Sequence, residues 1–474
     1  SKDANQAVSG TFAYAMSCAC PIVATAIPHT KEVLTSNEGI LVDIEDSCQL
    51  ANGTIQLLSD KNLRESMAIS AFAKTRASSW KNVALKQVAI YKKSIDYSLE
   101  VAYGYPPINL DHIKNMTTEL GIIQFCKISE PDIFSGYTLD DNARALIAMC
   151  SHYQYSKKSS DLTYIITYLT FIERCQTDLG TFINYVDENN NKHIQNDYVN
   201  LEDSNARAIW ALGMVISLKE YLPKTIVNRA VICLLKSSQW LKSILSPRAI
   251  GFVIKGLYLY YTAQQDKYVI TIIERLSKNL ITNYDVNTKK NWKWFENYLT
   301  YANSILPEAM LYNHLVTGKA SYKKVAIESF DFLLSKMFVN GHFKVISNKG
   351  WYQKDTIPNA YGEQPIDVSY TIQALDVFYK TFQDPKYKNK MQIAFNWFLG
   401  ENHLKQIMYD PITGGCHDGL ERENVNLNQG AESTICYLIA RVIMEQNKVV
   451  SSGKLIQLNE PKVSRYLKSI NNSI

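Results

Sequence analysis

The sequence lacks several patterns that mark common classes of protein. It has no long block of Lys or Arg, and its net charge of +5 comes from 50 basic and 45 acidic residues, which disfavours a nucleic-acid partner. No apolar run approaches the roughly 20 residues that a membrane span needs. The start "SKDANQAVSGTFAYAM" is not typical of a signal or transit peptide, because no basic stretch precedes an apolar core. We therefore expect a cytoplasmic protein without a membrane span.

Patterns for metals and disulfides are also missing. The nine cysteines have no paired C-x-x-C spacing, and an odd number of scattered thiols indicates free or buried cysteines in a reducing compartment. HExxH, EF-hand and P-loop motifs are absent, and the eight histidines are dispersed. The sequence thus predicts no metal site and no cofactor.

What the sequence does contain is length and aromatic residues. At 474 residues, a chain with 46% hydrophobic residues predicts two domains, one of them large. Tyrosine is abundant at 30 residues, beside 7 Trp and 16 Phe. Amphipathic rings suit a surface that stacks on a ligand and hydrogen-bonds it, and a Tyr-rich core is the alternative interpretation.

Residues 1–103 alternate between helical and strand patterns. Short apolar runs, "PIVATA" and "GILVDI", predict two strands, and the segments around them have helical apolar spacing. This order is typical of a doubly wound α/β domain, although two strands make only an incomplete sheet. The segment "SGT" (residues 9–11), at the start of the first predicted helix, predicts either a phosphate site at a helix N-terminus or a plain helix cap.

The stretch "AMSCACPIVATAIPHTKEVLTSNEGILVDIEDSCQLANGTIQLLSDKNLRESM" resembles the closing half of the second Rossmann-like domain of GT-B glycosyltransferases of family 4. In that family two glutamates eight residues apart contact the sugar nucleotide, and their positions here hold Gln6 and Tyr14. The resemblance implies that this chain alone does not transfer sugar from a nucleotide. Two alternatives follow: the chain is a piece of a longer transferase, whose missing domain is its partner, or the α/β part is a remnant that now only packs.

From residue 104 the pattern becomes helical. The prolines of "YGYPPIN" mark the boundary, and "LDDNARALIAM" and "EDSNARAIWALG" are two copies of one repeat, with Asn142 and Asn205 at equivalent positions. Weaker copies begin near residues 246, 300, 363 and 428. Six such blocks, each polar at its start and apolar afterwards, predict six inner helices with outer helices between them. We expect an (α/α)6 toroid over 104–447, followed by a C-terminal tail over 448–474.

The polar starts of the inner helices are expected to line one shared funnel. Its carboxylates, amides and aromatic rings, with few cations, are typical of a site for an uncharged glycan. The alternative for single residues such as Asp140, Asp203 and Ser246 is an ordinary helix N-cap. The expected substrate-binding residues are Tyr137, Asp140, Glu202, Arg248, Trp292, Trp294, Tyr301, Glu308, Glu363, Gln364, Asp367, Asp418, Glu421, Asn428, Gln429 and Glu432.

Toroids with acidic helix mouths resemble the catalytic domains of glycoside hydrolases and phosphorylases, and sugar epimerases. The motifs of 110–440 also resemble the helical region that follows the transferase domain in some bacterial family-4 glycosyltransferase-like proteins. Glycoside cleavage needs a carboxyl group that donates a proton and an ionised one that acts as base or nucleophile. We expect Glu296, among aromatic residues, as the acid, and Asp203 and Asp141 at helix N-termini as bases. A surface Glu on an aromatic-rich helix is the alternative for Glu296.

Two functions remain open from the sequence. The first is an enzyme that cleaves or modifies a glycan, and the second is a non-catalytic glycan-binding or scaffolding module of a glycosyltransferase. Funnel carboxylates about 5–10 Å apart across an open pocket favour hydrolysis. Carboxylates held in ion pairs by Arg144, Arg207 and Arg248 favour the second function.

Overall fold

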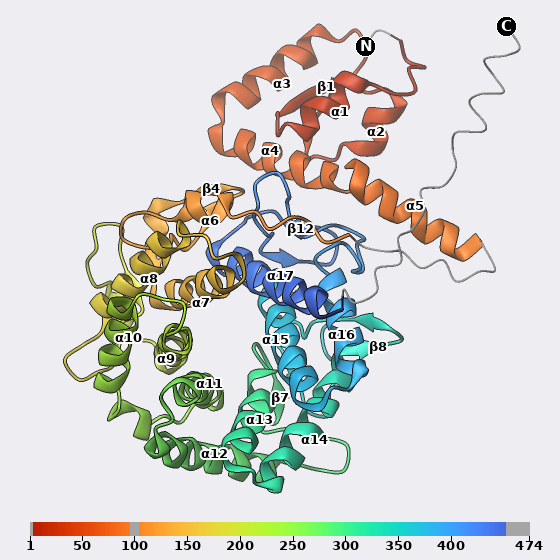
Figure 1. The fold of residues 1–474 in the computed structure, drawn as a ribbon. Coiled ribbons are helices and arrows are strands. Elements are labelled where there is room, and N and C mark those ends of the chain that lie inside the picture. The colour runs from red at the N-terminus through yellow and green to blue at the C-terminus, as the bar shows by residue number, and fades with distance from the viewer. Residues whose placement is uncertain (1–2, 95–103, 452–474) are drawn as a thin grey trace, which may run out of the picture.

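The computed structural model describes residues 3–94 and 104–451, which form a small N-terminal α/β unit and a large helical ring (Figure 1). The predicted boundary reaches residue 103, and the predicted tail beyond Ser451 likewise lies outside the described residues. In the described ranges, no helix combines the length and apolar character needed to cross a bilayer. All nine cysteines are free thiols, six of them buried.

The N-terminal unit is built on a two-stranded parallel sheet, with Ile22 opposite Gly39 and Thr25 opposite Val42. Phe12 and Met16 of its first helix pack against Ile22 and Leu34 in a small core. Ser9 caps the first helix by accepting a hydrogen bond from Phe12 N, as the plain-cap interpretation expects. The elements are α1 (Gly10–Ser17), β1 (Ile22–Thr25), α2 (Pro28–Val33), β2 (Gly39–Val42), α3 (Ser47–Ser59), α4 (Lys61–Arg76) and α5 (Trp80–Ser94).

Six inner helices form a closed ring. Each contacts the next, and the last contacts the first. These helices are α7 (Leu139–Ser156), α9 (Glu202–Ser217), α11 (Pro247–Gln264), α13 (Ile305–Thr317), α15 (Pro365–Phe382) and α17 (Ala431–Ser451). The repeat blocks thus predicted all six inner helices, although α13 begins five residues after the start of its block at residue 300. The fold is the (α/α)6 toroid.

Outer helices alternate with the inner ones around the ring (Figure 1). They are α8 (Asp161–Cys175), α10 (Lys224–Lys236), α12 (Lys267–Asn287), α14 (Ala320–Met337) and α16 (Pro385–Asn396), and the sixth position holds the short α6 (Asp111–Met116), which contacts α17. A continuous hydrophobic core lies between the two layers. The ring therefore has one outer helix much shorter than the repeat pattern suggests.

Short strands and 3-10 turns occur in the loops, which the sequence did not predict. The antiparallel pairs are β3 (Cys126–Lys127) with β4 (Glu130–Pro131), β5 (Tyr137–Thr138) with β6 (Tyr185–Val186), β7 (Tyr298–Leu299) with β10 (Tyr352–Gln353), β8 (Phe338–Val339) with β9 (His342–Phe343), and β11 (Gly419–Leu420) with β12 (Val425–Asn426). The 3-10 turns are η1 (Ile133–Ser135), η2 (Ile194–Asp197) and η3 (Trp240–Lys242).

The repeated Asn has a structural role. Asn142 accepts a hydrogen bond from Ile122 N and donates to Thr138 O. Asn205 accepts from Phe182 N and donates to Phe182 O. Each side chain therefore fastens a preceding loop to the start of an inner helix, where buried backbone groups need partners.

Two glycines allow α9 and α11 to touch backbone to backbone. A Cβ atom on Gly213 would lie 2.2 Å from Gly256 O, and one on Gly256 would lie 2.5 Å from Ile209 O. Any larger residue at either position would force the two helices apart. This close approach fixes the spacing between the N-terminal ends of the two helices, which we call their mouths.

Candidate functional site

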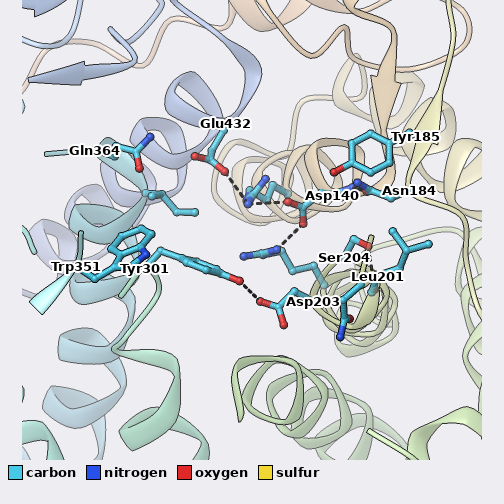
Figure 2. A pocket seen from close by; sticks show the side chains of 14 residues that line it. Asp140, Asn184, Tyr185, Leu201, Asp203, Ser204, Tyr301, Trp351, Gln364 and Glu432 are labelled. Carbon is cyan, nitrogen blue, oxygen red and sulfur yellow. Dashed lines mark hydrogen bonds and ion pairs between the residues drawn. The ribbon is translucent and has the colours of Figure 1, made fainter. Parts of the chain in front are cut away.

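A cavity of about 290 Å³ lies where the inner helices begin (Figure 2). Its lining side chains come from the first two turns of α7 and α9, from the first turns of α15 and α17, and from the loops between helices. We call it the Trp351 cavity. It is lined by Asp140, Arg144, Asn184, Tyr185, Asn200, Leu201, Asp203, Ser204, Arg207, Tyr301, Trp351, Gln364, Ile366 and Glu432.

A second cavity of about 400 Å³, which we call the Asp418 cavity, adjoins the first. The two share Asp140, Asn184, Tyr185, Gln364 and Glu432, so they are parts of one polar space, the funnel. The Asp418 cavity is further lined by Gln124, Phe125, Thr138, Asp141, Asp418, Asn426, Gly430 and Ser433.

Arg144 connects three carboxylates in the wall of the funnel. Its Nη2 lies 3.0 Å from Asp140 Oδ2 and 2.8 Å from Glu432 Oε2, and its Nη1 lies 2.9 Å from Asp141 Oδ1. The Arg144 side chain is 2% exposed. Its charge is therefore already matched by the protein's own carboxylates.

Arg207 is neutralised in the same way. Its Nη1 lies 2.7 Å from Asp140 Oδ1, its Nε donates to the Tyr370 hydroxyl at 3.2 Å, and its guanidinium stacks 4.5 Å from the Phe252 ring centroid. Burial favours the neutral acid, but the charges of Arg144 and Arg207 outweigh it and lower the pKa of Asp140. Asp140 is thus an ionised partner of two arginines.

Asp203 is held by hydroxyl groups. Tyr301 donates to its Oδ2, a contact visible in Figure 2, and Ser246 donates to its Oδ1 at 2.7 Å. Ser246 also caps α11 by accepting from Ala249 N, which confirms the cap interpretation for this residue. Asp140 and Asp203 instead lie in the first turns of their helices and point into the funnel.

Three carboxyl groups near the mouth are shifted toward the neutral acid. Burial raises the pKa of Asp141 to about 7, with Arg144 opposing it in part. Burial raises the pKa of Asp367 to about 7, although Ala302 N donates to it. Burial also raises the pKa of Asp418 to about 6, against hydrogen bonds from Ser433 and Gly430 N. Of the three, Asp141 and Asp418 line the funnel.

The predicted acid Glu296 does not line either cavity of the funnel. Arg248 Nη1 lies 2.9 Å from its Oε2 and 3.1 Å from its Oε1. Trp292 and Trp294 are 4% and 0% exposed, because their rings pack into the core against Phe332. The aromatic cluster around Glu296 is therefore part of the core. Glu296, which was expected to act as the acid, is instead held in an ion pair with Arg248.

Other predicted residues have partners elsewhere. Glu308 pairs with Lys255 and accepts from Tyr312, Glu363 accepts from Trp397, and Glu202 accepts from the backbone of Leu245 and Ser246. Arg248 donates to Tyr301 O, Tyr137 bonds Thr118, and Glu421 pairs with Lys349. Asn428 accepts from Ile128 N, and Gln429 accepts from Thr413. The structure thus brings together Asp140, Asp141, Asp203, Tyr301, Gln364, Asp418 and Glu432 in the funnel.

Sequence reasoning missed Asn184, Tyr185 and Trp351, which line the funnel from loops. Trp351 has a φ of +57°, a left-handed conformation that is uncommon for a residue other than glycine. It lies with its ring centroid 6.1 Å from that of Tyr301. No repeat or helix pattern covers these loops, so no signal in the sequence could have identified them.

Comparisons with known proteins find a match for the N-terminal unit by sequence and for the toroid by fold. The family described as glycosyl transferases group 1 matches residues 12–74. D-mannose isomerase is similar to the chain with a TM-score of 0.54 and 14% identity, over 71% of this chain and 94% of that one. Cellobiose 2-epimerase from Bacillus thermoamylovorans has a TM-score of 0.55 and 11% identity, over 77% and 100%. No curated relative matches the chain by sequence.

A third similar structure is an inactive variant of an α-1,6-mannanase of Salegentibacter sp. HEL1_6 in complex with α-1,6-mannotetrose. Its TM-score is 0.50 at 14% identity, and it covers 70% of this chain and 95% of its own. At these identities the likeness concerns the fold: residues 104–451 form a toroid. Residues 12–74 resemble part of a glycosyltransferase.

Proposed function

We propose that the chain is a carbohydrate-active protein whose toroid binds an uncharged glycan in the funnel. One observation carries this proposal: Arg144 and Arg207, the cations that line the funnel, are both neutralised by lining carboxylates. Such a wall has hydroxyl-binding groups but no unmatched positive charge for a phosphate or a uronate. The similar toroids named mannose isomerase, cellobiose epimerase and mannanase support a sugar as ligand.

The available groups match a sugar's two surfaces. The ring of Trp351 lies at one side of the Trp351 cavity and Tyr185 at the other, and flat rings cover the C–H face of a pyranose (Figure 2). Asn184, Gln364 and Asp203 bring amide and carboxylate oxygens that accept hydrogen bonds from hydroxyl groups. Because two cavities join, an oligosaccharide suits the funnel better than a single sugar.

We infer a non-catalytic role, as a glycan-binding module that serves a glycosyltransferase. The ion pairs of Arg144, Arg207 and Arg248 hold Asp140, Asp141, Glu296 and Glu432 in fixed positions, which supports binding more than proton transfer. The partner is a transferase domain carrying the nucleotide-sugar site, since Gln6 and Tyr14 stand in place of the two glutamates. Tyr14 is 76% exposed on α1.

Calorimetry tests the binding proposal. Titration with mannose-, glucose- and galactose-containing oligosaccharides should give saturable binding to at least one series. Matched uronate oligosaccharides and the nucleotide sugars of UDP and GDP should bind much more weakly or not at all. Micromolar binding of a nucleotide sugar, with none of a neutral glycan, contradicts the proposal.

Glycoside hydrolysis is a second candidate, and Asp418 favours it. Its carboxyl group lines the Asp418 cavity, and a pKa of about 6 leaves about a tenth of it protonated at pH 7 and more at weakly acidic pH, as a proton donor requires. Asp203, held by hydroxyl groups, is then the base. Product analysis after incubation with each oligosaccharide decides this: hydrolysis that Asp418→Asn slows about 10²–10⁴-fold supports the enzyme. Binding without any cleaved product supports the module.

A further inference from the structure

A cavity of about 450 Å³ lies outside the funnel, and a predicted funnel residue faces it. Glu363 contributes its side chain here, whereas the next residue, Gln364, lines the funnel. We call this space the His403 cavity. It is lined by Val339, Asn340, His342, Phe343, Lys344, Ala360, Tyr361, Glu363, Glu401, Asn402, His403 and Lys405.

His403 has an oxygen atom beside each of its ring nitrogens. Nδ1 lies 3.6 Å from Glu363 Oε1, and Nε2 lies 2.8 Å from Glu421 O and 3.3 Å from Arg422 O. A neutral imidazole carries one N–H, so one of its nitrogens would turn a lone pair toward an oxygen. Only the protonated ring donates to both sides.

The two sides that His403 joins both carry funnel residues. Glu363 precedes Gln364 at the mouth of α15, and its Oε2 accepts from Trp397 Nε1 at 2.7 Å. Its backbone exchanges two hydrogen bonds with Leu420, at 3.0 and 2.9 Å. Leu420 belongs to the β11–β12 hairpin, which brings Asp418 and Asn426 into the funnel.

The hairpin therefore reaches the mouth of α15 through one backbone bridge and one ionisable side chain. The Glu363–Leu420 bridge does not change with pH. The His403 contacts to Glu421 O and Arg422 O fasten the turn of the hairpin, and they share one ring with the contact to Glu363. Loss of the proton leaves either the turn or Glu363 Oε1 without the donor that His403 supplies, while Glu363 Oε2 keeps its bond from Trp397.

We propose that protonated His403 is a positioning residue, which holds the β11–β12 hairpin against the mouth of α15 so that the funnel binds its glycan more tightly at acidic than at alkaline pH. This inference rests on the proposed glycan-binding function. It assigns a role to a side chain that contacts neither cavity of the funnel.

The charged and polar groups around His403 favour its protonated form. The Glu363 carboxylate, 3.6 Å from Nδ1, raises the pKa of His403 above its ordinary value, and burial offsets the rise only in part. A raised histidine pKa means that the stabilising contribution is complete below the ordinary value near 6.5 and is lost as the pH passes the raised pKa. The titratable or charged groups around the ring are His342, Lys344, Lys349, Tyr361, Glu363, Glu401, Lys405, Glu421 and Arg422.

Two variants of the full chain separate charge from shape. His403→Gln cannot ionise and should bind glycan weakly at every pH. His403→Arg stays charged and should retain tight binding at both about pH 5.5 and about pH 8.5. The wild type should lose about five- to tenfold in affinity between these values by calorimetry, a typical size for coupling between sites. His342→Gln is the matched control, because this histidine lines the same cavity and is 68% exposed, and it should keep the wild-type profile.

Hydrogen exchange gives a measurement that does not need a glycan. After correction for the intrinsic effect of pH, residues 418–426 should exchange faster at the alkaline value in the wild type and equally fast at both values in His403→Gln. If the hairpin responds this way but no oligosaccharide binds, the proposed function fails and the role of His403 stands. If His403→Gln keeps the wild-type difference in hairpin exchange, the positioning role is overturned, whatever the funnel binds.

Discussion

Arg144 on α7 and Glu432 on α17 are joined by an ion pair of 2.8 Å, which links the first and the last inner helix of the ring. The same guanidinium contacts Asp140 and Asp141 of its own helix. A site residue and a ring-closing residue are therefore the same side chain. The shape of the funnel and the closure of the toroid cannot be varied independently at this position.

Arg144→Met should destabilise the fold strongly. The change removes the cation that pairs with the buried Asp141 and with Glu432, and it removes one of the two cations that pair with Asp140. Breaking one side of a buried ion pair costs roughly 3–5 kcal/mol. Urea denaturation measures the loss. Lys61→Met is the control, since its pair with Glu65 spans 3.7 Å between well exposed side chains and should change stability little. Equal effects of the two substitutions would contradict this account.

Trp351→Ala should lower glycan affinity about tenfold while the melting temperature stays nearly unchanged, because an aromatic contact is worth roughly 1 kcal/mol and Trp351 lies partly exposed in a loop. Calorimetry and thermal melting check the two parts. Trp80→Ala, at a side chain 90% exposed outside the funnel, should change neither. Trp294→Ala would instead remove a fully buried ring and report on folding.

The difference between Trp294 and Trp351 illustrates what the sequence could predict. Repeats with helical apolar spacing predicted the inner helices, because burial on one or both faces imposes a periodicity that can be read. Asp140, Asp203 and Glu432 followed from this, since they lie in the first turns of those helices. The position of Trp351 in the funnel depends on a left-handed turn in a loop, and the burial of Trp294 depends on which side of its segment faces the core. Neither is encoded in a local pattern.

The arginine pairs show a further limit. The repeat contains Arg144 and Arg207 at matching places, yet spacing alone does not say that both reach Asp140. Glu296 was expected to be an acid among aromatic rings, but those rings point into the core and Arg248 covers the carboxylate. Side-chain direction in irregular segments depends on tertiary packing, which a single sequence does not display.

Asp418→Asn should change how stability depends on pH. Between about pH 4 and the raised pKa of about 6, the folded chain holds a proton that the unfolded chain has released, so stability falls as the pH rises through this window. The variant lacks this decline, which amounts to roughly 3 kcal/mol. Denaturation at a series of pH values measures it. Asp141 and Asp367 have the same sign up to about pH 7 and remain in both proteins, so only the difference between variant and wild type is diagnostic.

The buried pair of Lys255 and Glu308 predicts a rescue experiment. Lys255 Nζ lies 2.8 Å from Glu308 Oε1, and both side chains are nearly inaccessible. Lys255→Met alone should cost roughly 3–5 kcal/mol, because it leaves a carboxylate buried without its cation. Adding Glu308→Leu should restore most of the stability measured in urea. A double variant that stays as unstable as the single one would show that packing, and not charge, dominates here.

A chain that begins at Gly104 should fold by itself. The ring closes through α17 and α7, and the contacts that the N-terminal unit makes with it include Asn82 Oδ1 with Ile407 N, and Leu85 near Gly400. Circular dichroism and a cooperative melt should resemble those of the full chain, with faster hydrogen exchange confined to residues near 400–412. A molten product would mean that α5 completes the core of the toroid.

The glycine contact between α9 and α11 has a consequence for the width of the opening. Because the ring is closed, a methyl group on Gly213 or Gly256 would act as a wedge, and the displacement would pass to the neighbouring helices. Asp203 and Arg248, at the mouths of these two helices, would then move apart although neither was altered. Gly213 and Gly256, which lie in the apolar contact between the two helices, thus determine the width of the polar funnel. Natural variants that admit a ligand of different girth are therefore to be sought at Gly213 and Gly256 as well as among the residues that touch the ligand.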